Sequence, residues 1–179
     1  MNCWGSINIR RQFGTRRSII LAMLFGFSSF VLLYLPLTLI HKDARIVDHG
    51  LLPLLIGLAL LPLVHKFLHV IPFKCGNKNM KLSWSIVIKC IPYFKICANT
   101  KVSKPTVLIA LLLPTLLITI PCIVLSYVYP SYYPYLLLFS AINLSLSYSD
   151  FVYFRHIWKA PKKCIISNEE QGYDILIPR

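Results

Sequence analysis

The chain has 179 residues, 56% of them hydrophobic, and a formal net charge of +13. A soluble domain of this length does not need so much apolar surface, so the composition indicates an integral membrane protein. The basic residues do not form part of a recognisable nucleic-acid-binding module, so we expect no nucleic-acid partner. The expected partner of these basic residues is the lipid bilayer, through its anionic headgroups.

Four apolar segments are long enough to cross a bilayer, which takes about 20 helical residues. They are 18–40, 51–73, 106–127 and 132–154. The sequence therefore predicts an all-α membrane fold, with 1–179 as a single integral membrane domain, a four-helix transmembrane bundle, a loop at 74–104 and a tail at 155–179. Basic residues precede the first segment, as in a signal peptide, but its apolar region is too long for one, so we expect it to be retained.

Basic and neutral segments alternate between these spans. Arginines precede the first span, loop 74–104 holds seven lysines and no acid, and the tail is basic again. The loop after the first span is balanced, and the turn before the fourth span has no charge. Because cytoplasmic loops carry the excess of Lys and Arg, we expect a multi-pass protein of the cell membrane with both termini and loop 74–104 in the cytoplasm.

The polar appendages show weaker patterns. Residues 1–15 are expected to lie along the membrane face. Residues 81–89 alternate apolar and polar side chains, Ile91 and Pro92 interrupt the pattern, and 93–99 resume it, which predicts a β-hairpin on the cytoplasmic side. An amphipathic interfacial segment that only anchors the chain is the alternative. The tail predicts a short C-terminal hairpin, and the six scattered cysteines predict no disulfide framework.

The second span carries two histidines, His65 and His69, spaced four residues apart. This spacing places both on one face of a helix. Ionisable side chains at membrane depth are costly and usually functional. An i, i+4 histidine pair is also half of a metal site.

The fourth span carries the complementary polar face, with Asn143, Ser147 and Asp150 at i, i+4 and i+7. Spans two and four both enter from the outer side, so His65, His69 and Asp150 reach a similar depth near the cytoplasmic leaflet. Two histidines and a carboxylate with one open position form the pattern of a catalytic zinc site. Asn143 is a candidate for orienting a bound carbonyl or stabilising an oxyanion.

These parts together resemble the putative zincin peptidase family of small bacterial membrane proteins, which is similar in plan to the site-2 intramembrane metalloproteases. The resemblance rests on His65-KFL-His69, the basic middle segment with its hairpin, the helix from Asn143 to Asp150, and the tail strand Tyr173-DILI. It implies zinc held by His65, His69 and Asp150. It also implies a transmembrane or membrane-proximal protein segment as substrate or partner.

Lys66 departs from the family pattern. The position after the first histidine of HExxH holds the glutamate that takes a proton from zinc-bound water. A lysine is cationic unless strongly desolvated, so it would repel zinc rather than activate its water. The sequence therefore predicts a site-2-protease-like metallopeptidase homologue that binds or cleaves a membrane segment, degenerate and with little or no activity because Lys66 replaces the glutamate. An active metallohydrolase is the alternative within the same family.

Two other readings use no zinc. In a non-enzymatic structural or regulatory membrane protein, His65 and Lys66 would reach the cytoplasmic interface, and Asp150 would pair with Lys66 or Arg155. A transporter is a third class, but the chain has neither internal repeats nor paired broken helices to indicate one. His41, His49 and His156 lie in loops or at span ends and are assigned no role.

The predicted topology can be checked with reporter fusions. Fusions at Gly50 and Lys101 should report opposite sides of the membrane, because the single predicted span 51–73 separates the two positions. Reporters that appear on the same side would contradict the four-span arrangement.

Overall fold

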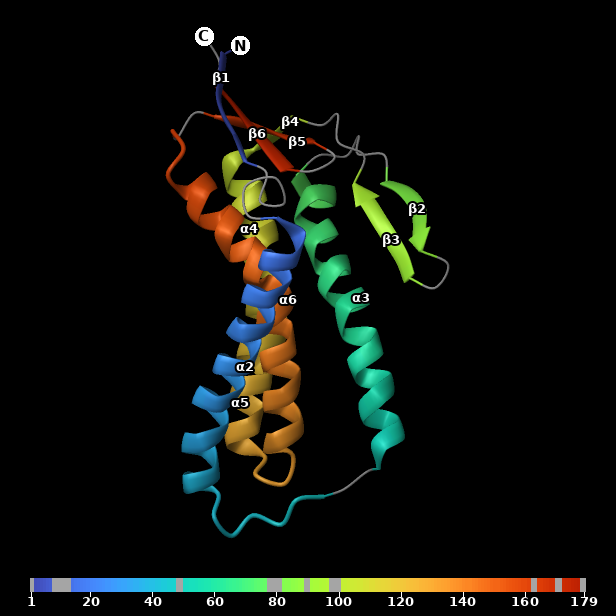
Figure 1. Cartoon of the computed structure of the whole chain (residues 1–179), viewed down its shortest axis with the longest axis vertical. Helices are drawn as coiled ribbons and strands as arrows, with labels where there is room; N and C mark the ends of the chain where they lie inside the picture. The colour runs from blue at the N-terminus through green and yellow to red at the C-terminus, as the bar shows by residue number, and fades with distance from the viewer. Residues whose placement is uncertain are drawn as a thin grey trace.

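The computed structural model describes residues 2–7, 14–47, 50–76, 82–88, 91–96, 101–161, 164–169 and 172–177. Within them, four helical segments are long and apolar enough to cross a membrane (Figure 1), as predicted. They are α2 (Thr15–Ile40), α3 (Leu51–Gly76), a third made of α4 (Lys104–Pro114), a π-helical turn (Thr115–Thr119) and α5 (Ile120–Val128), and α6 (Tyr133–Trp158). Each begins or ends within four residues of its predicted boundary.

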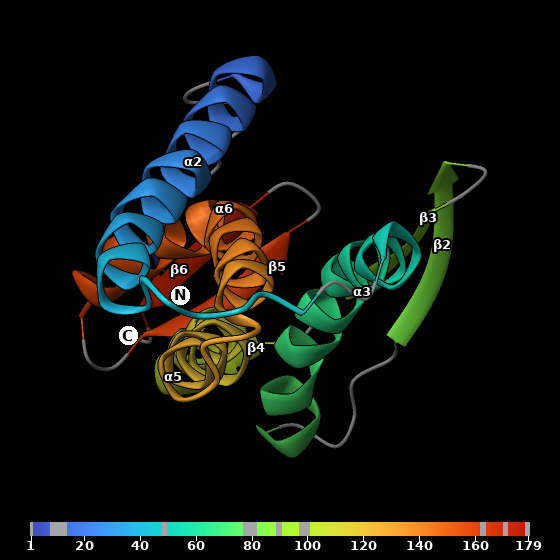
Figure 2. The same ribbon diagram turned by 90° about the horizontal axis from the view of Figure 1, so that it is seen from below.

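Helix α6 lies at the centre of the bundle and contacts α2, α3, α4 and α5. Figure 2 shows α2 and the α4–α5 segment on different sides of α6, with α3 at the periphery. The large side chains that line the outer faces of α2 and α3 are exposed, as expected of residues that face lipid. Because lipid offers no backbone partners, helices are the stable form of these segments.

Small residues allow α2 and α3 to approach α6 closely. A Cβ atom on Gly26 would lie 2.6 Å from the Cβ atom of Ser145, and one on Gly57 would lie 2.6 Å from the Phe139 ring. The Ser145 hydroxyl also donates a hydrogen bond to the Ala22 carbonyl at 2.9 Å. Packing of small residues with interhelical hydrogen bonds is the usual basis of helix association in membranes.

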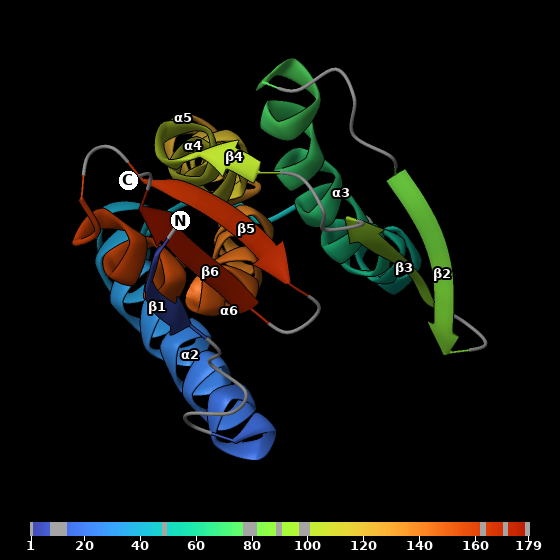
Figure 3. The ribbon, with the colours of Figure 1, turned by 90° about the horizontal axis from the view of Figure 1, so that it is seen from above.

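A four-stranded antiparallel sheet covers one end of the bundle (Figure 3), with strand order β1-β6-β5-β4. The strands are β1 (Asn2–Ile7), β4 (Lys101–Ser103), β5 (Ile165–Glu169) and β6 (Gly172–Ile177). Strands β5 and β6 confirm the predicted C-terminal hairpin. Residues 2–7 pair with β6 in this sheet. The placement of residues 1–15 along the membrane face stays a prediction, and residues 8–13 lie outside the described part.

The predicted middle hairpin is present as a separate two-stranded sheet, β2 (Leu82–Ile88) and β3 (Ile91–Ile96). The expected interruption at Ile91 and Pro92 was wrong, since both residues belong to β3 and Pro92 is in register with Ile86. A register shift between Ile86 and Ile88 accommodates the proline, since a strand tolerates a residue without an N–H at such an irregularity.

An apolar core joins the four-stranded sheet to the helix ends. Ile166 and Ile175 point from β5 and β6 onto Val107, Leu111 and Ile157. Lys104 fixes the same junction from the side, since its Nζ donates to the carbonyl oxygens of Trp158 and Ala160 at the end of α6. A lysine there satisfies carbonyls that a helix end leaves unpaired. Both chain ends lie at this end of the bundle (Figure 1).

Gly26→Val should destabilise the bundle. The added side chain meets the Ser145 Cβ atom and the Ala141 carbonyl at contact distances that force α2 away from α6. Overpacking of this kind costs about 1–3 kcal/mol. Thermal unfolding in detergent measures the loss, and Ser28→Val, on the exposed face of the same helix, is the control that should unfold near the wild-type temperature. Equal unfolding temperatures for the two variants would contradict this packing.

Candidate metal centre

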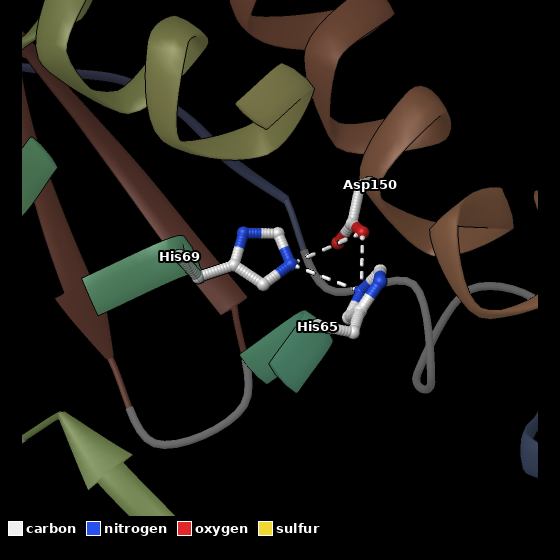
Figure 4. Close-up of side chains that lie close together, drawn as sticks. All are labelled: His65, His69 and Asp150. Atoms are coloured by element: carbon white, nitrogen blue, oxygen red, sulfur yellow. Dashed lines mark hydrogen bonds and ion pairs between the residues drawn. The ribbon is translucent and has the colours of Figure 1, made fainter. Parts of the chain in front are cut away.

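Three candidate ligands predicted from the sequence meet between α3 and α6 (Figure 4). His65 Nε2 lies 3.2 Å from His69 Nε2, and each of these nitrogens lies 3.3 Å from Oδ2 of Asp150. The histidines come from successive turns of α3, and the aspartate comes from the facing side of α6. The i, i+4 spacing and the matched depth of the two spans therefore place all three donor atoms around one point.

The three side chains are withdrawn from the surface. His65 is 5% exposed, and the side chains of Asp150 and His69 are 13% and 18% exposed. Asp150 is the only acidic residue in the four spanning helices. A carboxylate at this depth is costly unless a positive charge or hydrogen bonds compensate it.

Asn143 fixes the orientation of His65. Its side-chain Nδ2 donates to the Pro114 carbonyl at 3.1 Å and to the Thr119 hydroxyl at 2.9 Å. A carbonyl can only accept, so the amide nitrogen must be on that side and the amide oxygen on the other. That oxygen lies 2.8 Å from His65 Nδ1. His65 therefore carries its proton on Nδ1 and presents the lone pair of Nε2 to the centre.

A backbone carbonyl fixes the orientation of His69 in the same way. Its Nδ1 lies 2.7 Å from the carbonyl oxygen of Ala110 on α4. Because that oxygen is an acceptor, Nδ1 must donate, and Nε2 is left to face His65 and Asp150. Metal-binding histidines commonly donate their second ring nitrogen to a carbonyl or a carboxylate in this manner.

The centre consequently gathers three electron-pair donors, two imidazole nitrogens and one carboxylate oxygen. Asp150 Oδ2 is buried and receives no hydrogen bond of regular geometry from the described residues. The lone pairs of the three donor atoms repel one another unless a proton or a cation lies between them. In a tetrahedral zinc site with bonds of about 2.0–2.1 Å, ligand atoms lie about 3.3–3.4 Å apart, so the observed separations fit zinc with one position open.

The remaining predicted site residues have different environments. Lys66 follows His65 on α3 and its side chain is partly buried. Asn143 is fully buried, and both of its amide hydrogens already donate within the bundle. Contact with an oxyanion would require one of these bonds to break, so the predicted oxyanion role stays a prediction while the geometry gives Asn143 a role in orienting His65.

Sequence reasoning missed the contribution of the third span. The Ala110 carbonyl, the Pro114 carbonyl and the Thr119 hydroxyl all contact the groups around the centre. Main-chain atoms leave no composition signal, although Pro114 did mark a break in helical hydrogen bonding. The interfacial placement of His65 proposed in the metal-free reading differs from the structure, which buries this ring against Asn143.

One of three comparisons with known proteins gave a match. Curated proteins and solved structures gave no match to the chain. A family model described as a putative zincin peptidase matches residues 58–165, which is more than half of the chain and includes both histidines and the aspartate. The chain therefore belongs to the putative zincin peptidase family.

Proposed function

We propose that the protein is a site-2-protease-like membrane metalloprotein that binds zinc through His65, His69 and Asp150 and holds a membrane-spanning or membrane-proximal protein segment beside it. The observation that carries this proposal is the convergence of the two Nε2 atoms and Oδ2 within 3.2–3.3 Å of one another. Membership of a zincin family supports the choice of zinc.

A zinc ion held there would polarise a peptide carbonyl and activate water for attack on it. The chain's own residues supply the setting for that chemistry. Asn143 and the Ala110 carbonyl hold the imidazoles with Nε2 toward the centre, so little reorganisation is needed on binding. The surrounding helices exclude most water, which strengthens electrostatic interactions at the centre.

An apolar cavity supports a membrane segment as the partner. Its volume is about 440 Å³, and residues of α3, α5 and α6 line it at the end of the bundle away from the sheet. His65, His69 and Asp150 are not among the lining residues, so a segment bound there would have to extend along the helices to reach the centre. The cavity wall includes Leu54, Leu136 and Phe139, and Phe139 lies one turn before Asn143 on α6. Apolar walls of this kind favour aliphatic or aromatic side chains of a bound segment over a polar substrate. We propose that the partner approaches the centre along this side of α3.

Lys66 favours binding over cleavage. In HExxH peptidases the residue at this position is a carboxylate that removes a proton from water. A lysine ammonium cannot accept that proton, and Asp150, the sole acid of the spanning helices, is already part of the donor set. We propose that hydrolysis by the natural chain is slow and that retention of a membrane segment is its main activity. In this proposal both termini and the sheet face the cytoplasm.

Zinc binding can be measured directly. Protein purified in detergent should contain about one zinc per chain by elemental analysis, and His69→Ala and Asp150→Ala should lose it, because each removes one of three ligands. His156→Ala is the matched control, since His156 is exposed near the end of α6 and outside the donor set. Wild-type protein without zinc, even after dialysis against zinc, would contradict the proposal and favour the structural reading.

Lys66→Glu should raise proteolysis of a membrane segment. The substitution restores the HExxH pattern, and general-base assistance is typically worth about 10²–10⁴-fold in rate. Cleavage of reporter membrane segments by the reconstituted variant measures the gain. Adding His65→Ala should abolish it, because the glutamate has no activated water to deprotonate. Lys66→Gln is the control for loss of the positive charge. A folded, zinc-loaded Lys66→Glu variant that is no faster than Lys66→Gln would show that more than the base is missing.

A further inference from the structure

Pro114 lies in the third spanning segment, at the junction between α4 and the π-helical turn. Its side chain is fully buried, whereas Pro121, at the other end of the turn, is exposed on the surface of the bundle. A buried proline within a membrane helix removes a backbone donor, and the acceptor it leaves must find another partner in the hydrocarbon. The partner of that acceptor gives Pro114 a specific role.

The acceptor that Pro114 leaves is the carbonyl of Ala110. In a regular α-helix this oxygen would accept from the N–H four residues later, which is position 114. Proline has no N–H, and the next amide, that of Thr115, donates to Leu112. His69 Nδ1 occupies the position instead, 2.7 Å from the Ala110 oxygen. The hydrogen bond that orients His69 therefore uses an acceptor from which residue 114, as a proline, withholds the usual helical donor.

The second contact runs through the carbonyl of Pro114 itself. This oxygen accepts from Asn143 Nδ2 at 3.1 Å, and the contact sets which way the Asn143 amide points. The amide oxygen then faces His65 Nδ1 at 2.8 Å. Pro114 thus acts on His69 through the Ala110 carbonyl and on His65 through Asn143. In both cases the histidine must carry a proton on Nδ1 to donate the hydrogen bond.

We propose that Pro114 is the positioning residue of the centre, which holds His69 by withholding a backbone donor and His65 by orienting Asn143. It leaves both Nε2 atoms as electron-pair donors toward Asp150. The importance of this arrangement for metal rests on the zinc function proposed above. The position of the proton on each histidine ring does not rest on the zinc function, because it follows from hydrogen bonds that exist without any ion.

Pro114→Ala separates the two contacts. Alanine supplies the missing N–H, which competes with His69 for the Ala110 carbonyl, but it keeps the carbonyl that binds Asn143. Nitrogen-15 spectra of histidine-labelled full-length protein, stripped of metal, report whether each ring nitrogen carries a proton. Wild type should show protonated Nδ1 on both rings. Pro114→Ala should expose a bare Nδ1 on His69 alone, and Asn143→Leu should do so on His65 alone.

Metal affinity gives a second readout. Titration of metal-free protein with zinc against a chelating dye should show affinity lowered about 10–100-fold in Pro114→Ala, the usual cost of losing an outer contact to a ligand. When cobalt is substituted for zinc, Pro114→Ala should show a visible spectrum that differs from that of the wild type. Pro121→Ala is the matched control, because it restores a donor in the same span on the exposed side, and it should retain wild-type affinity and spectrum.

The outcomes distinguish the two proposals. A bare Nδ1 on either ring of the wild type overturns the role of Pro114, and this measurement decides the matter even if Pro114→Ala fails to fold. Unchanged zinc affinity and cobalt spectrum in folded Pro114→Ala also overturn it. Wild-type protein that binds no zinc but carries both Nδ1 protons would refute the zinc function and leave the positioning role intact.

Discussion

The structure depends on one electrostatic constraint, the meeting of two imidazole nitrogens and a carboxylate oxygen inside a helix bundle. Three electron-pair donors 3.2–3.3 Å apart are stable there only with a cation or a proton between them. The hydrogen bonds from both Nδ1 atoms increase the constraint, because they direct the lone pairs inward. Removing the histidines from α3 would leave the largely buried Asp150 carboxylate without the two groups that it faces.

The rest of the bundle holds this centre by close packing together with a few hydrogen bonds between elements. Gly26 and Gly57 let α2 and α3 approach α6, and the sheet fastens the helix ends through an apolar core. Pro114 and the π-helical turn interrupt the third span beside the centre, where the interruption supplies acceptors. Irregular backbone at membrane depth is tolerated because side chains from neighbouring helices satisfy it.

Lys66 stands where HExxH peptidases carry the glutamate base, so the centre keeps the metal-ligand pattern without the base. The ligand set and its supporting hydrogen bonds are complete by geometry, whereas the usual proton acceptor is missing. Under the proposed function, a centre that holds zinc without a base would suit recognition better than turnover, since substrate polarisation survives the loss of proton transfer. The membrane segment that we propose as the partner would pack in the apolar cavity at the end of the bundle away from the sheet.

The sequence by itself determined the four spanning helices, both hairpins and the three residues of the centre. Hydropathy over about 20 residues and i, i+4 spacing are local signals, and they survive folding because lipid forces each segment to satisfy its own backbone. Only the tertiary structure decided the pairing of β1 with β6, the burial of Asn143 against His65 and the use of the Ala110 carbonyl by His69. These contacts join residues 41 to 175 positions apart through main-chain atoms or single side chains, and no periodicity in the sequence encodes which partner each one meets.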